Sequence, residues 1–284
     1  MNHPQTIYQL IKRSSELYPN YAAFTLITKL DPEFCHTEVS YRQFFSDVKR
    51  AGRMFSEVSE KKADVVVSTL LPNIPQHHVA LWGAECIGIA NPLNPLLSVG
   101  AITELILKAD SDILISVGPT PGIDIWEKAK KAVADVERQA GKKIKLFAVS
   151  LLPPTLKMML RLINAPLPSV VKSESVRNDF DRALRCYSDD ELDATLLNRN
   201  QDVVAYFHTG GTTGTPKLAK HTALNQLTSA SRVCSNSDFQ PGEKVLNGLP
   251  LFHVAGAIVT SLGALLSGMN IVLPTIKVSV ILTS

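Results

Sequence analysis

The stretch from Tyr206 to Thr222, YFHTGGTTGTPKLAKHT, holds residue types that can bind a polyphosphate. Its glycines let the backbone approach a ligand closely and turn successive N–H groups toward one anion. Its threonine hydroxyls can donate to phosphate oxygens, and its lysine supplies a positive charge. The candidate binding residues are Thr209, Gly210, Gly211, Thr212, Thr213, Gly214, Thr215 and Lys217. Together they favour a site for a nucleoside triphosphate.

The residues around the lysine exclude one common type of phosphate loop. A Walker A loop ends in Gly-Lys-Ser/Thr, because the hydroxyl after the lysine binds magnesium. Here Pro216 precedes Lys217 and Leu218 follows it. A P-loop NTPase or kinase is therefore excluded.

The chain around this loop alternates between apolar runs typical of buried strands and segments with helical periodicity. Strands are predicted at 64–71, 112–117, 144–149, 202–208 and 244–250. Helices are predicted at 75–86, through Trp126, Ala129, Val133 and Val136, and near 222–233. This alternation indicates an α/β fold with mostly parallel sheets flanked by helices. The loop follows the strand at 202–208, and ligands bind α/β sheets at the carboxyl ends of such strands.

Two capping boxes predict where the first helices begin. Thr6 and Ser40 are the expected N-caps, with Gln9 and Gln43 three residues later reaching back to the cap backbone. Each opens an amphipathic helical repeat.

The composition of the sequence changes along the chain and predicts three parts. Residues 1–150 form a first α/β lobe, 151–200 a polar surface connector, and 201–284 a second lobe that carries the phosphate loop. The connector begins with a basic amphipathic piece at 151–168, bounded by prolines. Contact of this piece with a membrane surface is an alternative to packing within the protein, which is favoured.

Charge and cysteine usage restrict the class of protein. The 284 residues include 29 Lys and Arg against 26 Asp and Glu, without a dense basic cluster, so nucleic-acid binding is not indicated. The cysteines are Cys35, Cys86, Cys186 and Cys234. Their wide spacing favours reduced thiols, and no metal site is predicted. The N-terminal residues lack the apolar core of a signal peptide, so we expect a cytoplasmic protein.

One long uncharged segment tests this assignment. Residues 254–274 are almost long enough to span a bilayer. Gly263, Gly268 and Asn270 divide the segment into a helix-sized and a strand-sized piece. A buried helix–turn–strand is therefore favoured over a membrane span, and no integral membrane span is expected.

The order T-G-G-T-T-G-T-P-K resembles the phosphate loop of the adenylate-forming superfamily, which includes acyl-CoA synthetases, luciferases and peptide-synthetase adenylation domains. Gly210 stands where serine is commoner in that family, and Leu218 where glycine is commoner. Segments 71–98 and 249–256 are similar to corresponding segments of fatty acyl-CoA synthetases, as are the opening helices. The similarity extends over most of residues 4–275.

The resemblance implies a fold, a reaction and ligands. The fold would be part of the large N-terminal domain of an adenylate-forming enzyme. A carboxylic acid, here a fatty acid, would attack ATP to give an acyl-adenylate, and coenzyme A would then accept the acyl group. The loop residues Thr209–Lys217 would hold the β- and γ-phosphates of ATP with Mg²⁺.

The resemblance also places His253 near the carboxylate and thioester site. Without it, a histidine after Phe252 would be read as packed in the core. For His208, directly before the loop, packing is favoured over a role in the site.

Several later family elements have no match in this sequence: the aromatic-Gly-x-Thr-Glu segment, the ribose-binding aspartate, the hinge and the C-terminal domain with its lysine. Thr103-Glu104 lies upstream of the loop, at the wrong spacing. We therefore expect an incomplete acyl-CoA synthetase that makes no acyl-CoA alone. The alternatives are an adenylation domain with another acceptor, and a non-catalytic module that binds a nucleotide or a partner. The identity of the acid and the oligomeric state are not predicted.

Overall fold

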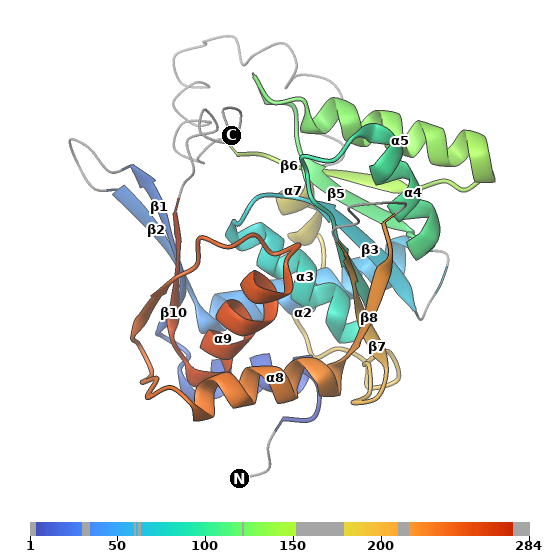
Figure 1. Cartoon of the computed structure of the whole chain (residues 1–284). Coiled ribbons are helices and arrows are strands. Elements are labelled where there is room, and N and C mark those ends of the chain that lie inside the picture. Colours follow the sequence, from blue (N-terminus) through green and yellow to red (C-terminus); the bar gives the residue numbers. More distant parts are fainter. Residues whose placement is uncertain are drawn as a thin grey trace.

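The computed structural model describes residues 4–29, 35–59, 61, 64–120, 122–151, 179–209 and 216–274. These residues form two sheets with helices between and around them (Figure 1). The larger sheet has the strand order β6-β5-β3-β4-β7-β8, and the smaller has the order β2-β1-β10-β9. All neighbouring strands are parallel except β1–β2 and β7–β8. The expected α/β fold with mostly parallel sheets is confirmed.

The strands of the larger sheet are β3 (Val65–Leu70), β4 (Gly88–Pro92), β5 (Ile113–Val117), β6 (Lys145–Val149), β7 (Val203–His208) and β8 (Leu218–Thr222). Those of the smaller sheet are β1 (Ala22–Lys29), β2 (Cys35–Ser40), β9 (Lys244–Leu246) and β10 (Asn270–Pro274). The helices are α1 (Ile7–Leu17), α2 (Tyr41–Val58), α3 (Pro75–Ile87), α4 (Val99–Ala109), α5 (Ile125–Ala140), α7 (Phe180–Leu184), α8 (Ala223–Ser235), the π-helix η2 (Ala255–Leu262) and α9 (Gly263–Ser267).

The larger sheet is covered on both faces. Helices α4 and α5 lie on one face, while α2 and α3 lie on the other, toward the smaller sheet (Figure 1). Every residue of β3 is buried, as its continuous apolar run predicts. Helix α3 is buried from His77 to Ile87, and the His78 ring packs 4.5 Å from the Phe24 ring of β1. Helix α3 therefore fills the space between the two sheets.

The capping predictions are confirmed in part. The Thr6 and Ser40 side chains accept hydrogen bonds from the backbone N–H groups of Gln9 and Gln43. The predicted hydrogen bonds from the Gln9 and Gln43 side chains back to the cap backbone are wrong, because both side-chain amides have other partners. Gln9 Oε1 accepts from the Gln5 N–H at 2.8 Å, and Gln43 Nε2 donates to Asp47 at 3.0 Å.

The uncharged segment folds as helix, turn and strand. Helices η2 and α9 are continuous, Gly268 ends them at a φ of +72°, and β10 follows as an inner strand of the smaller sheet. Only glycine adopts this left-handed conformation readily. Across the described ranges, none of the helices has the length and hydropathy needed to cross a membrane.

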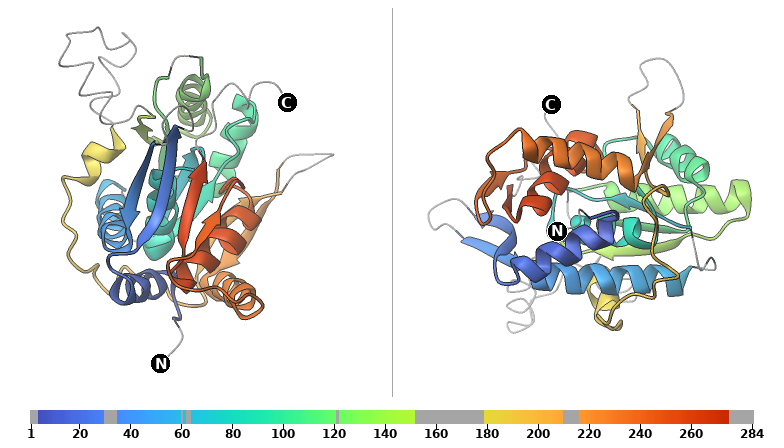
Figure 2. Two further views of the ribbon diagram at one scale, coloured as in Figure 1. Left: turned by 90° about the vertical axis from the view of Figure 1, so that its left-hand side faces the viewer. Right: turned by 90° about the horizontal axis from the view of Figure 1, so that it is seen from below.

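The expected lobes share their sheets. Strands β7 and β8 complete the sheet of β3–β6, and β9 and β10 extend the sheet of β1 and β2. Figure 2 shows the blue strands β1 and β2 beside the red strand β10. The three-part division into 1–150, 151–200 and 201–284 stays a prediction, and most of the expected amphipathic piece, 152–168, lies outside the described residues.

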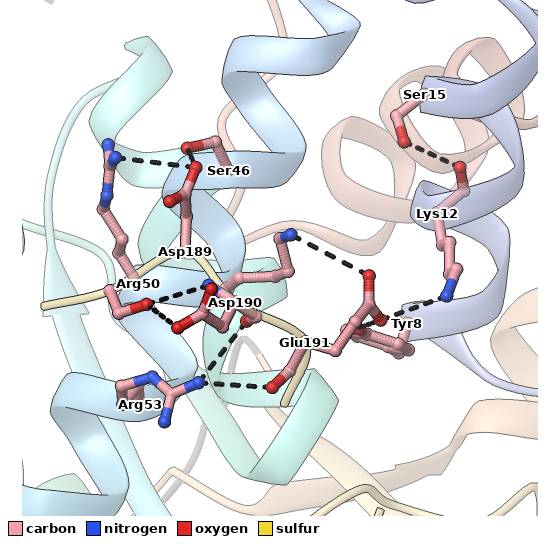
Figure 3. Close-up of polar contacts among 11 residues, drawn as sticks. Tyr8, Lys12, Ser15, Ser46, Arg50, Arg53, Asp189, Asp190 and Glu191 are labelled. Carbon is pink, nitrogen blue, oxygen red and sulfur yellow. Dashed lines mark hydrogen bonds and ion pairs between the residues drawn. The ribbon is translucent and has the colours of Figure 1, made fainter. Parts of the chain in front are cut away.

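Residues 189–191, within the predicted connector, dock on the two N-terminal helices α1 and α2 (Figure 3). Ser46 donates to Asp189 at 2.6 Å, and Arg53 donates to the carbonyl oxygens of Asp190 and Glu191. The carboxylate of Glu191 also accepts from Tyr8 and from Lys12. These contacts join residues 189–191 to α1 and α2.

Candidate functional site

The predicted phosphate loop lies between β7 and β8, which pair as an antiparallel hairpin. His208 lies opposite Leu218 in the antiparallel register, and the Thr209 N–H donates to the Lys217 carbonyl oxygen at 2.9 Å. The hairpin therefore brings Thr209 and Lys217 together, and both are exposed. The other predicted loop residues, Gly210, Gly211, Thr212, Thr213, Gly214 and Thr215, lie outside the described residues.

The loop leaves the sheet at the edge expected for a ligand site. Strand β7 runs parallel to β4, with Ala90 opposite Ala205, and β4 runs parallel to β3. The ends of these three strands lead into the segments at 71–73, 93–97 and 209–217. Backbone groups at the carboxyl ends of parallel strands bind ligands in many α/β proteins.

The N-terminal end of the loop is held by His208. Its Nε2 accepts a hydrogen bond from the Asn94 N–H at 3.2 Å, in the turn after β4. Its ring stacks on Phe252, with centroids 5.9 Å apart and planes 18° from parallel. Burial lowers the pKa of His208, which favours the neutral ring and leaves Nε2 as an acceptor.

The C-terminal end of the loop is held by Lys108. Its ammonium group, in the last turn of α4, donates to the Pro216 carbonyl oxygen at 3.0 Å. The same ammonium group pairs with Glu104, one helical turn earlier, at 2.7 Å. The turn after β4 thus contacts the N-terminal end of the loop, and helix α4 contacts its C-terminal end.

The turn carrying Phe252 and His253 is fixed by the side-chain amides of Asn247, which is buried, and Asn73, which is half-buried. Asn247 Nδ2 donates to the Gly256 carbonyl oxygen at 3.1 Å and to Ser261 Oγ at 2.8 Å. Asn73, from the segment after β3, donates to the carbonyl oxygens of Asn247 and Leu249. A Cβ on Gly256 would lie 2.4 Å from the Pro250 carbonyl oxygen, so only glycine fits there.

His253 is exposed, so the alternative of a packed core histidine is wrong. Its Nδ1 accepts from the Ala255 N–H at 3.2 Å, and its carbonyl oxygen accepts from the Ala257 N–H at 3.0 Å. The π-helix η2 begins two residues after His253. Such helices are rare and frequently occur at functional sites.

The family model described as AMP-binding enzyme matches residues 11–281. The chain belongs to the AMP-binding enzyme family. The resemblance of the loop and its flanking segments to the adenylate-forming superfamily is therefore confirmed.

The curated relatives of this chain include several CoA ligases. Marinolic acid–CoA ligase of Pseudoalteromonas sp. (strain SANK 73390) is 30% identical over 244 residues, which is 82% of this chain and 33% of the relative. The long-chain-fatty-acid–CoA ligase FadD13 of Mycobacterium tuberculosis is 25% identical over 82% of this chain and 39% of the relative. The chain spans between a third and two fifths of the length of these two relatives.

Solved structures of similar fold agree with the assignment. The N-terminal domain of FACL13 from Mycobacterium tuberculosis matches 97% of this chain and 59% of its own, with a TM-score of 0.70 and 18% identity. Apo MatB from Rhodopseudomonas palustris matches 95% of this chain and 45% of its own, with a TM-score of 0.70 and 14% identity. These likenesses show that this chain shares the fold of such domains.

The sequence did not indicate which residues support the loop. Asn73, Asn94, Lys108 and Phe252 contact it or its neighbouring turn from distant parts of the chain. The resemblance to fatty acyl-CoA synthetases could have indicated three of them, because the matching segments contain Asn73, Asn94 and Phe252. For Lys108 the sequence gave no signal, because its partner Pro216 is 108 residues away.

Helix α3 holds further residue types that can do chemistry, but it buries them. His77, His78, Glu85 and Cys86 are all inside the protein. Burial raises the pKa of the Cys86 thiol well above its ordinary range, which disfavours the reactive thiolate. In the part of the chain that the structure describes, no three His, Cys, Asp or Glu residues are grouped as a metal site.

Proposed function

We propose that this chain is the part of an ATP-dependent carboxylate–CoA ligase that binds the phosphates of ATP. The observation that carries the proposal is the meeting of two segments at the carboxyl edge of the larger sheet. The base of the phosphate loop lies there, and His208 stacks on Phe252, the residue before His253. Nucleotide and carboxylate would therefore bind side by side, as transfer of an adenylyl group requires.

The reaction has two steps. A carboxylate oxygen attacks the α-phosphorus of ATP, the bond to the bridging oxygen breaks, and pyrophosphate leaves with the electron pair. The sulfur of coenzyme A then attacks the acyl carbon, the bond to AMP breaks, and the thiol proton is released. Negative charge grows on the phosphate oxygens in the first step, so fixed positive charge and N–H or O–H donors lower the barrier.

The chain's own residues would take the following parts. Lys217 would place its positive charge beside the departing pyrophosphate, and the Thr209 hydroxyl would donate to a phosphate oxygen. The residues Gly210, Gly211, Thr212, Thr213, Gly214 and Thr215 would surround the β- and γ-phosphates. Mg²⁺ would arrive with ATP as the MgATP substrate. His253, exposed on its turn, would lie beside the carboxylate and the thioester.

The proposed substrate class is a carboxylic acid, with a fatty acid as the specific proposal. The relatives support the broader class, since their names give marinolic acid, sulfoacetate, oxalate and long-chain fatty acids. The similarity of segments 71–98 and 249–256 to fatty acyl-CoA synthetases supports the narrower one. We propose a cytoplasmic protein, because ATP and coenzyme A are both available in that compartment.

The experiment compares the 284-residue chain with two lysine variants. Binding of MgATP and of oxalate, sulfoacetate and fatty acids of several lengths is measured by calorimetry, and carboxylate-dependent ATP–pyrophosphate exchange and CoA thioester formation are measured with the same acids. Lys217→Ala should weaken MgATP binding roughly ten- to a hundredfold, the usual cost of one lost hydrogen bond to a charged group, without lowering the melting temperature. Lys220→Ala is the matched control, because Lys220 is an exposed lysine on β8, outside the loop.

The outcomes separate the alternatives. MgATP binding by a chain that binds none of these carboxylates would favour a non-catalytic nucleotide-binding module. Exchange without a CoA thioester would favour an adenylation domain with another acceptor. A folded, monodisperse chain that binds no MgATP, or equal effects of the two lysine substitutions, would contradict the proposal.

A further inference from the structure

His208 is the point at which three separate segments of the site meet. The turn after β4 reaches it through the Asn94 N–H, 3.2 Å from Nε2. The turn before η2 reaches it through Phe252, whose ring lies 5.9 Å away and nearly parallel. The phosphate loop begins at the next residue, Thr209.

The two contacts fix the orientation of the imidazole ring. A backbone N–H can only donate, so Nε2 must accept and the neutral ring carries its proton on Nδ1. The hydrogen bond fixes the direction of the ring edge, and the stack on Phe252 fixes the plane. The ring is half-buried, so displacement would expose apolar surface of both rings.

The position of the His208 ring affects both the loop that would bind the nucleotide and the turn that would lie beside the carboxylate. On one side, His208 is opposite Leu218 in the hairpin, and the bond from the Thr209 N–H to the Lys217 carbonyl oxygen closes the loop. On the other side, Phe252 is directly followed by His253. A displacement of the ring would therefore change the separation between the loop base and the turn.

We propose that His208 is a positioning residue that couples the phosphate loop to the Phe252–His253 turn and sets the distance between nucleotide and carboxylate. The proposal deepens the proposed function and rests on it for its catalytic consequence. The coupling itself is a property of the chain without ligand, so it can be measured separately.

The test begins with amide hydrogen exchange, which needs no substrate. Phe252→Ala and His208→Ala should each accelerate exchange at the Asn94 and Thr209 amides. His208→Phe keeps the stack and loses the acceptor, so it should affect Asn94 more than Thr209. His221→Ala is the matched control: this half-buried histidine of β8 packs 5.0 Å from Phe207 rather than on Phe252. It should leave both amides unchanged.

The second measurement is a double-mutant cycle on substrate binding. His208→Ala and Phe252→Ala should each raise the Kd for MgATP and the Kd for the carboxylate by about two- to tenfold. The double variant should be less impaired than the product of the two single effects, because each removes the same stack. Additive effects, or a fall in melting temperature with both constants unchanged, would overturn the positioning role.

The two proposals fail in different ways. If the unsubstituted chain binds no MgATP, the proposed function is lost, and hydrogen exchange still decides whether Phe252 controls the Asn94 and Thr209 amides. If the chain binds MgATP and Phe252→Ala leaves those amides unchanged, the coupling through His208 is wrong and the proposed function stands.

Discussion

Helix α3 and the end of the β7–β8 hairpin both concentrate residues that can do chemistry. Helix α3 holds two histidines, a glutamate and a cysteine within ten residues, and all are buried. The hairpin end holds Thr209 and Lys217, which are exposed, above the half-buried His208. The two regions therefore differ in whether solvent, and hence a ligand, can reach the reactive atoms.

The polar groups of α3 are directed to protein partners. His77 lies between Thr69 Oγ1 at 2.8 Å and the Pro72 carbonyl oxygen at 3.1 Å. Glu85 accepts from Gln226 of α8 at 3.2 Å, and burial raises its pKa well above the ordinary range, which favours the neutral acid. These contacts orient the helix between the two sheets, so α3 serves stability, whereas the proposed binding role belongs to the hairpin.

The largest test of this difference is Trp82→Ala at the centre of α3. Trp82 is fully buried, and removing such a side chain costs about 3–5 kcal/mol of the free energy of unfolding. Denaturant unfolding should show this loss, while the MgATP affinity of the remaining folded protein stays unchanged. Leu224→Ala, at an exposed apolar side chain of α8, is the control and should cost less than about 0.5 kcal/mol. If Trp82→Ala lost MgATP binding while it stayed folded, the proposed difference in role between α3 and the hairpin would be wrong.

The second test is the acid sensitivity of α3. Burial lowers the pKa of His77 to about 4, against an ordinary value of 6.5. Between these values the unfolded chain binds a proton that the folded chain does not. The contribution of neutral His77 to the free energy of unfolding is therefore fully present above pH 6.5. It falls by about 1.4 kcal/mol per pH unit as the pH is lowered to about 4. Denaturant unfolding from pH 7 to 4 should show a shallower slope for His77→Gln. An unchanged slope would mean that His77 is not the group that titrates.

The smallest test concerns the hairpin. Lys108→Met removes the contact to Pro216 and should weaken MgATP binding about two- to fivefold, because exposed charged contacts contribute little. Lys128→Met is matched, since Lys128 also pairs with an acid four residues earlier, Asp124, but belongs to α5. Calorimetry on both variants separates the loss of a helical ion pair from the loss of the loop contact. Equal affinities would show that Lys108 does not support the loop.

The sequence predicted those elements whose pattern is local. The apolar run of β3, the amphipathic repeat of α5 and the strand leading into the loop all carry their own signal, and the structure confirms them. Strands β2 and β8 were not predicted, because CHTEVS and LAKHT are largely polar. They form because a neighbouring strand supplies backbone partners at the edge of a sheet.

In the candidate site, the place of the loop directly after β7 was predicted from the order of the residues along the chain, and the structure confirms it. That the loop residues bind phosphate stays a prediction. The contacts of His208 with Asn94 and Phe252, and of Lys108 with Pro216, join residues far apart in sequence. No periodicity or spacing specifies such pairs, because the topology of the larger sheet brings them together.

The pairing of β1 with β10 has a consequence for how the chain forms on the ribosome. Phe24 lies opposite Ile271, so almost the whole described chain is made between the two strands. At about 5–20 residues per second, synthesis of that interval takes on the order of ten to fifty seconds. During this time one side of β1 has no strand partner, and exposed strand edges promote aggregation. The smaller sheet is therefore assembled late, and we expect a nascent chain arrested before residue 270 to depend on chaperones more than one released after β10.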